Sequence, residues 1–139
     1  MQLLDKISLG FGRKIPTILQ TEATECGLAC IAMIAHFYGY ESDLLTLRRR
    51  FPVSQKGTNL NQLIKISNQL NMVTRPLKLD LEDLNQLKTP CILHWDFNHF
   101  VVLQEVSANK VTILDPAFGK RILTLNEVSE HFTGVALEL

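Results

Sequence analysis

The stretch QTEATECGLAC, residues 20–30, places a glutamine six positions before one cysteine and ten before another. Three kinds of chemistry are compatible with this pattern: the cysteines bind a metal ion, they form a redox pair, or one of them is a nucleophile that Gln20 assists. Thr24 is a possible helix N-cap, and the apolar run from Cys26 to about Tyr38 predicts a central helix packed on several sides. The first cysteine therefore stands in the first turn of a buried helix.

The composition is that of an ordinary globular domain. Of 139 residues, 46% are hydrophobic, enough to bury a core without disulfides. The 14 basic and 14 acidic residues cancel, which argues against nucleic acid or an anionic membrane as a bulk partner. Three cysteines, an odd number, indicate free thiols in a reducing compartment. The basic cluster at 48–50 has two interpretations, cations at a helix C-terminus and a docking patch.

The N-terminal region, residues 1–19, is expected to be an irregular or short-stranded lead-in, and no N-terminal signal peptide is visible in it. Asp5 and Lys6 interrupt the place where the apolar core of a signal peptide would lie. The longest run without Asp, Glu, Lys or Arg is 26–40, shorter than the about 20 residues that span a bilayer. A GxxxxGK[ST] phosphate loop is also absent. The chain by itself is expected neither to cross a membrane nor to hydrolyse ATP.

The order of the predicted elements indicates an α+β fold. Helices are expected over about 26–38, 43–51 and 60–70. Six short β-rich segments follow, separated by turn residues: MVTRPLKL, PCILHW, HFVVLQEV, KVTILD, KRILTL and GVALEL. They predict a mostly antiparallel sheet, interrupted by short helices at 81–87 and 126–132. Helices first and strands later favour α+β over alternating βαβ units, and no repeat or linker divides the chain into two domains.

Cys26 is the candidate nucleophile. At a helix N-terminus the free N–H groups and the helix dipole stabilise a thiolate. Gly27 beside it leaves room for another backbone to approach. Cys30, one turn further in, is expected to be a small core residue.

His99 and Asp115 are the candidate partners of the cysteine. A thiol peptidase needs an imidazole to move protons and a third group to orient the imidazole. His99 begins the predicted strand HFVVLQEV, and Asp115 ends the next one. A hairpin around the turn 107–109 pairs Val101 with Asp115 and leaves His99 just beyond, so that the carboxylate can reach the ring. The alternative for Asp115 is a turn-forming role before Pro116.

Gln20 is the candidate oxyanion donor. A tetrahedral intermediate needs hydrogen-bond donors at its oxyanion, and a glutamine amide just upstream of the nucleophile, joined by the Cys26 backbone N–H, provides two. The alternative is that this loop glutamine only bonds nearby backbone.

These residues resemble a known family. The pattern Gln-x5-Cys-Gly-x2-Cys, the helix ending in Tyr-Gly, the segment LHWDFNHFVVL and the later LDP occur in this order. Together they resemble the bacteriocin-processing cysteine peptidase domain of bacterial ABC exporters, of the colicin V secretion type, from Gln20 to Leu139. The resemblance implies a papain-like fold, with Cys26 as nucleophile, His99 as base and acid, Asp115 as orienting residue and Gln20 as oxyanion donor.

The resemblance also implies a cellular setting. Such domains cut the leader peptide of a bacteriocin- or microcin-type precursor after a double-glycine motif, at the cytoplasmic face of the bacterial inner membrane, as the cargo is exported. Residues 1–139 are then expected to be the excised N-terminal domain of a longer exporter. Its partners are the leader peptide and the transmembrane and ATPase domains, not nucleic acid. Cleavage needs no metal or cofactor, since ATP is used only by other domains.

Trp95 and Phe97 are the candidate substrate-binding residues. One interpretation is core packing. The other is that they wall a narrow cleft that accepts only small residues, which explains a preference for glycine, because a side chain forced into a close-packed slot costs roughly 1–3 kcal/mol.

Several rival interpretations stay open at this point. A zinc site of Cys26, Cys30, Cys91 and one of His36 or His94 has an unusual spacing, and a redox pair usually has two intervening residues, not three. The resembled family has a sister branch, the haemolysin-type exporters, whose domain lacks the cysteine and only binds cargo. A non-catalytic leader-binding module is therefore an alternative, as is a free-standing papain-like amidase with another substrate.

Overall fold

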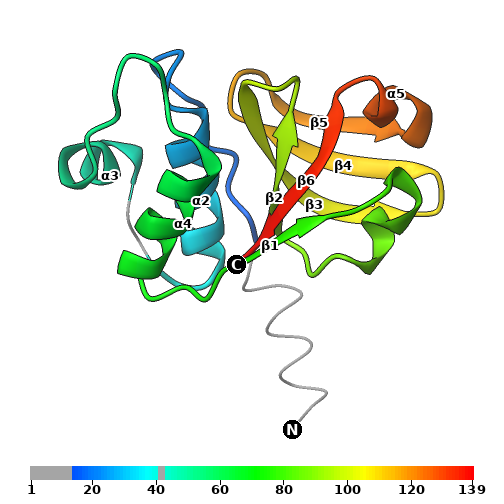
Figure 1. Ribbon diagram of the computed structural model, residues 1–139, viewed down its shortest axis with the longest axis horizontal. Helices are drawn as coiled ribbons and strands as arrows, with labels where there is room; N and C mark the ends of the chain where they lie inside the picture. Colours follow the sequence, from blue (N-terminus) through cyan, green and yellow to red (C-terminus); the bar gives the residue numbers. More distant parts are fainter. Residues whose placement is uncertain (1–13, 41–42) are drawn as a thin grey trace, which may run out of the picture.

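The computed structural model describes residues 14–40 and 43–139, so that most of the predicted lead-in, 1–13, lies outside the described residues. The helices are α2 (Cys26–Phe37), α3 (Leu44–Arg50), α4 (Leu60–Gln69), the 3-10 helix η1 (Leu81–Gln86) and α5 (Leu125–Ser129). The strands are β1 (Arg75–Lys78), β2 (Cys91–Trp95), β3 (His99–Ser107), β4 (Lys110–Asp115), β5 (Gly119–Thr124) and β6 (Phe132–Glu138). Helices α2, α3 and α4 gather on one side, and the sheet lies on the other (Figure 1).

Helix α2 confirms the prediction of a buried central helix. Every residue from Cys26 to Ala35 is buried, because the apolar side chains cover the whole circumference. Gly39 ends the helix with a φ of 88°, the left-handed conformation that glycine adopts without a steric penalty. The predicted N-cap, Thr24, was wrong: the N-cap is Glu25, and its side chain makes no capping hydrogen bond.

The two following helices have conventional N-caps. Asp43 accepts a hydrogen bond from the Thr46 N–H at 2.8 Å at the start of α3. Asn59 and Gln62 form a reciprocal capping box at the start of α4. No helix among residues 14–40 and 43–139 is long and apolar enough to cross a membrane.

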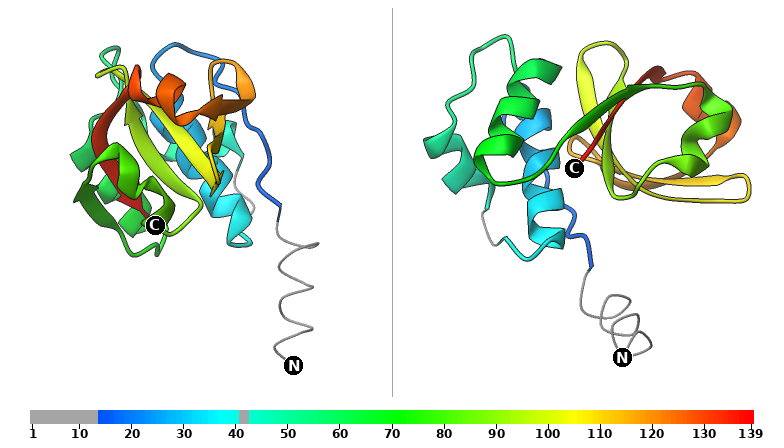
Figure 2. Two further views of the ribbon diagram at one scale, coloured as in Figure 1. Left: turned by 90° about the vertical axis from the view of Figure 1, so that its right-hand side faces the viewer. Right: turned by 60° about the horizontal axis from the view of Figure 1, so that its bottom comes forward.

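Over the described residues, the strands form one six-stranded sheet in the order β1-β6-β2-β3-β4-β5, with every neighbouring pair antiparallel. The sheet curls strongly and leaves the helical layer against one side of the curve, as Figure 2 shows. Helix α2 packs directly on β3. This arrangement places the N-terminus of α2 next to the sheet, where the ends of neighbouring strands can supply its chemical partners.

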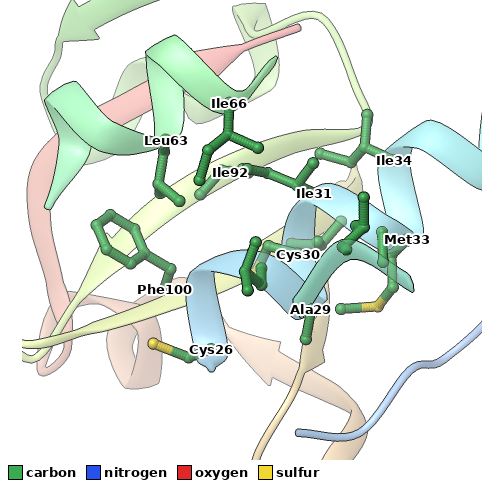
Figure 3. Close-up of a cluster of buried hydrophobic side chains, with 14 of the residues drawn as sticks. Cys26, Ala29, Cys30, Ile31, Met33, Ile34, Leu63, Ile66, Ile92 and Phe100 are labelled. Atoms are coloured by element: carbon green, nitrogen blue, oxygen red, sulfur yellow. The ribbon is translucent and has the colours of Figure 1, made fainter. Parts of the chain in front are cut away.

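The sheet has a hydrophobic cluster on each face because side chains alternate along a strand. The first cluster lies between α2 and the sheet and includes Ile92, Phe100 and Val102 (Figure 3). The second fills the inside of the curve and includes Leu93 and Trp95. The central strands β2 and β4 and the first half of β3 are buried on both faces over most of their length, so they hold their register firmly.

The hairpin of β3 and β4 differs in detail from the prediction. The turn has two residues, Ala108 and Asn109, because Ser107 pairs with Lys110, so the predicted three-residue turn was wrong. An irregularity between Leu103 and Glu105 then adds one residue to β3. Beyond it, Val102 pairs with Leu114, the register that the sequence predicted.

Candidate active site

The Cys26 side chain lies at the N-terminal end of α2, at the edge of the first hydrophobic cluster (Figure 3). It is 7% exposed, whereas Cys30 and Cys91 are completely buried. Burial raises the pKa of the Cys30 thiol well above its usual range and that of Cys91 to about 12. Only Cys26 combines some exposure with a helix N-terminus among these three free thiols, which are the conditions for a nucleophilic cysteine.

His99 and Asp115 meet as the hairpin geometry predicts. His99 Nε2 donates a hydrogen bond to Asp115 Oδ1 at 2.7 Å. Asp115 is 2% exposed and also accepts a hydrogen bond from the Ala117 N–H at 2.9 Å. Both bonds end on Oδ1, while Arg121 Nη1 lies 4.0 Å from Oδ2, so backbone and a nearby cation hold the carboxylate that orients the imidazole.

The electrostatics of this group favour a protonated imidazole. Burial lowers the pKa of His99, but the hydrogen bond to Asp115 and the interaction with Cys26 outweigh it and raise the pKa to about 9. Burial likewise raises the pKa of Asp115, but the hydrogen bonds from His99 and Ala117 outweigh it and hold the pKa below its usual range. Because Nε2 is taken by Asp115, Nδ1 is the ring nitrogen left for the sulfur of Cys26.

Gln20 lies beside this group but its amide is engaged locally. Its backbone N–H donates to the Pro116 carbonyl at 2.9 Å, next to Asp115. Its side-chain Nε2 donates to the carbonyls of Glu22 at 3.2 Å and Ala23 at 3.4 Å, both longer than the usual 2.9–3.0 Å or so. The loop thus brings Gln20 to the site. Its side-chain amide bonds nearby backbone, as the alternative interpretation of this glutamine expects.

A cavity of about 400 Å³ lies beside the start of α2 and includes Thr58, Leu60, Phe97 and Phe100 in its lining. A Cβ added to Gly27 would lie 2.5 Å from Thr58 Oγ1, so this wall of the cavity touches the residue after Cys26. Through Thr58 the lining of the cavity contacts Gly27, and through Asn98 it includes the residue before His99.

The two aromatic residues predicted to wall a cleft lie in different environments. Phe97 lines this cavity and is 84% exposed. Trp95 is 2% exposed, belongs to the second hydrophobic cluster and stacks on the His131 ring. Trp95 thus takes the core-packing alternative, because strand alternation turns it to the face that carries Leu93.

Comparison with known proteins agrees with this geometry. The profile of the Peptidase C39 family matches residues 14–139. The chain belongs to the Peptidase C39 family. This family comprises cysteine peptidases of papain-like fold, in agreement with the α+β prediction.

Two relatives from Escherichia coli are 50% identical to this Peptidase C39 chain over 138 residues. They are the probable microcin-H47 secretion/processing ATP-binding protein MchF and the colicin V secretion/processing ATP-binding protein CvaB. Each match covers 99% of this chain and 20% of the relative. The chain thus spans about a fifth of the length of these relatives.

Two solved structures share the fold. A double glycine motif protease from an AMS/PCAT transporter, in complex with its leader peptide, superposes with a TM-score of 0.84 at 35% identity, covering 90% of each chain. The peptidase domain of Streptococcus ComA superposes with a TM-score of 0.81 at 25% identity, covering 90% of this chain and 97% of that one. The predicted family resemblance is confirmed.

The zinc alternative requires several metal-binding side chains to lie close together in the described part of the chain. No group of three or more His, Cys, Asp and Glu side chains converges there. Cys91 belongs to the second hydrophobic cluster, while Cys26 and Cys30 belong to the first, on the other face of the sheet. The zinc alternative therefore lacks a common centre in these residues.

Sequence reasoning missed one ion pair of this Peptidase C39 chain, between a buried carboxylate and a half-exposed arginine. Glu25, the residue before Cys26, is 2% exposed and bonds to Arg48 of α3. The sequence interpretation of the 48–50 cluster as cations near a helix C-terminus did not name this partner. The sequence signal that could have predicted this pair is a glutamate directly before an apolar helix, because a carboxylate buried there needs a cationic partner.

Proposed function

We propose that this chain is a thiol endopeptidase in which Cys26 is the nucleophile, His99 the general base and acid, Asp115 the residue that orients His99, and Gln20 an oxyanion donor. The observation that carries the proposal is the 2.7 Å hydrogen bond between His99 Nε2 and the buried Asp115 carboxylate, beside a cysteine at a helix N-terminus. A cysteine, an imidazole and an orienting carboxylate form the arrangement of nucleophilic catalysis.

Acylation begins with a thiolate–imidazolium pair. With a pKa of about 9, His99 is protonated at neutral pH, and the positive charge favours the Cys26 thiolate. The sulfur attacks the carbonyl carbon of the scissile bond, and the C–O electron pair moves onto oxygen. The Cys26 N–H and the Gln20 amide donate to this oxyanion, once the amide exchanges its two long backbone contacts for the stronger charged acceptor.

The tetrahedral intermediate then collapses. The C–N bond breaks, and His99 gives its Nδ1 proton to the departing amine, leaving a thioester on Cys26. Neutral His99 next takes one proton from water as the water oxygen attacks the thioester carbonyl, and the C–S bond breaks to release the product as a carboxylic acid, which gives its remaining proton to solvent. The thiolate and the imidazolium are restored. Every step uses a protein group or water, so we propose that cleavage requires no metal or cofactor.

We propose that the substrate is the leader peptide of a bacteriocin- or microcin-type precursor, cut after a double glycine. The names of the secretion and processing relatives and the leader-bound double glycine motif protease support this assignment. In this chain, exposed Phe97 lines the cavity beside Gly27. We propose that Phe97 contacts the leader peptide near the cut.

We propose a matching cellular setting. The chain corresponds to about a fifth of two relatives named as secretion and processing ATP-binding proteins. We infer that residues 1–139 are the peptidase domain of an ABC exporter, at the cytoplasmic face of the bacterial inner membrane. Its transmembrane and ATPase domains would be the partners, and ATP would be used by those domains alone.

The test is cleavage of a synthetic leader ending in Gly-Gly and followed by a short cargo tail, under reducing conditions with a chelator present. Intact mass spectrometry should show one cut after the second glycine. Cys26→Ala should bind the peptide and leave it uncut, and a peptide with Val-Val at the cut should survive. Binding without cleavage by the wild type would instead identify a leader-binding module, and efficient cleavage of the Val-Val peptide would identify a broader amidase.

A further inference from the structure

Glu25 is a buried carboxylate directly before the proposed nucleophile, and the proposed mechanism does not use it. It is 2% exposed. Its Oε1 accepts hydrogen bonds from the Thr21 N–H at 3.2 Å, the Thr21 hydroxyl at 2.8 Å and the Glu22 N–H at 3.0 Å. The side chain therefore folds back over the loop that leads from Gln20 to Cys26, and it bonds two successive backbone amides of that loop.

Arg48 of α3 completes the set of donors to this carboxylate. Its Nη2 donates to Glu25 Oε1 at 3.0 Å, and its Nε donates to Oε2. Nη2 also contacts the Thr21 hydroxyl. The hydrogen bond from Arg48, followed by those from Thr21 and Glu22, overcomes burial and lowers the pKa of Glu25 to about 2. A carboxylate this deeply buried persists only when it is fully paired.

The loop of residues 20–25 is thus fixed at both ends. At its start, the Gln20 N–H donates to the Pro116 carbonyl, one residue after Asp115. At its end, Glu25 holds the loop amides and is anchored through Arg48 to α3. These two anchors set the position of Gln20 relative to both Asp115 and Cys26.

Glu25 also leaves the N-terminus of α2 without a capping side chain. It is the N-cap of α2, yet its side chain makes no capping hydrogen bond. An ordinary cap side chain accepts from the N–H of the second or third helical residue. Because the carboxylate turns away, the N-terminal amides of α2, including that of Cys26, are not occupied by a capping side chain. The positive charge of Arg48 meanwhile cancels a negative charge that would otherwise oppose a neighbouring thiolate and oxyanion.

We propose that Glu25 and Arg48 are positioning residues of the oxyanion hole, which hold the loop 20–25 so that the Gln20 amide and the Cys26 N–H meet the same carbonyl oxygen. The inference rests on the proposed peptidase function. Neither side chain is a catalytic residue, since each acts through the loop. The pair should therefore affect the step that develops an oxyanion and leave other reactions of Cys26 nearly unchanged.

The experiment compares two reactions of the same sulfur. Cleavage of the Gly-Gly leader peptide passes through an oxyanion, whereas alkylation of Cys26 by iodoacetamide does not. In Glu25→Gln, the one remaining oxygen can still accept from the two loop N–H groups, but the new NH2 group faces the Nε–H donor of Arg48 and the negative charge is gone, so the anchor between the loop and α3 is broken. We expect kcat to fall about 10- to 100-fold, with KM and the alkylation rate each changed by less than about threefold.

Arg48 provides the second arm and a matched control. Arg48→Met keeps the side-chain length without the charge, and Arg48→Lys keeps the charge without the planar fork, so Lys should restore part of kcat. Because the two residues act as a unit, Arg48→Met should add little to Glu25→Gln in a double-mutant cycle. The control is Arg49→Met, exposed on the same helix, which should leave both reactions unchanged.

The outcomes separate this inference from the function on which it rests. If the wild type does not cut the leader, the proposed function fails. If the wild type cuts and kcat of the variants stays within about twofold of it, the positioning role is wrong. Equal losses of cleavage and alkylation would also overturn it, provided that melting curves show the variants to be folded. Such a result would mean that Glu25 and Arg48 act on the reactivity of the Cys26 thiol and not on the oxyanion. Should Glu25→Gln not fold, the Arg48 variants give the same comparison at a half-exposed side chain.

Discussion

The bond between His99 and Asp115 leads to a quantitative prediction. Asp115→Asn keeps the size of the side chain and one acceptor oxygen, which the Ala117 N–H and His99 can still use. It removes the negative charge that helps to raise the pKa of His99 from 6.5 to about 9. The variant should fold normally, because the hydrogen-bonding pattern survives, and the proton on His99 should be held less tightly.

The sign and the size of the effect follow from the proposed role of His99 as the acid. In the wild type, kcat/KM should fall as pH rises through about 9, where His99 loses its proton. A neighbouring charge of opposite sign typically changes the pKa of a group by about 1–3 units. Each unit corresponds to about 1.4 kcal/mol. In Asp115→Asn the alkaline limb should therefore move down by about 1–2 pH units, which lowers kcat/KM at pH 8.5 by about 3- to 25-fold through protonation alone.

The assay is kcat/KM for the Gly-Gly leader peptide from pH 6 to 10, followed by mass spectrometry. Asp96→Asn is the matched control, because Asp96 also bonds a histidine, His131, at 2.8 Å, at a position with no proposed role in catalysis. Its alkaline limb should stay where the wild type has it. An unchanged limb in Asp115→Asn, alongside a wild-type limb near pH 9, would refute the assignment of Asp115 as the group that holds the imidazolium.

Four further predictions follow from other parts of the structure. Gly27→Ala places a Cβ 2.5 Å from Thr58 Oγ1, so chemical denaturation should show a loss of about 1–3 kcal/mol. Phe97→Ala, at an 84% exposed side chain, should leave the melting temperature unchanged and raise KM for the leader about 5- to 30-fold; an unchanged KM would exclude Phe97 from the cleft. Gln20→Ala should lower kcat about 10²- to 10³-fold with little change in KM, and a normal kcat would leave only its backbone role. The pKa of Glu25 is lowered from 4.5 to about 2, so the stability it contributes is present above pH 4.5 and lost as pH falls towards 2; melting curves of Glu25→Gln should lack this acid dependence.

Much of the helical layer could be predicted because its signals are local. The continuous apolar run of α2 indicates burial on all sides, and the bounds of α3 and α4 agree with prediction to within a residue or so at each end. The N-cap was predicted one residue too early because a Thr is the better intrinsic cap. Glu25 holds that position since its carboxylate bonds Thr21, Glu22 and Arg48, the last from 23 residues away, which no local rule can detect.

The candidate site could be predicted because its residues stand at element ends. His99 begins β3 and Asp115 ends β4, and a hairpin brings those two ends together whatever the details of its turn. The side-chain environments were harder. Trp95 and Phe97 are two residues apart in the sequence, yet Trp95 lies in a strand and Phe97 in a turn with a φ of 64°, so the strand alternation that buries Trp95 does not extend to Phe97.

The extra residue in β3 has a consequence for how such a chain can change in evolution. The two-residue turn shifts the pairing of β3 and β4 by one position, and the irregularity between Leu103 and Glu105 shifts it back before His99 is reached. Deleting the extra residue of β3 would leave this offset uncorrected and turn the His99 side chain away from Asp115. A change in the length of the turn should therefore be tolerated only together with a compensating insertion or deletion at the irregularity in β3. These two positions are then expected to change together in evolution.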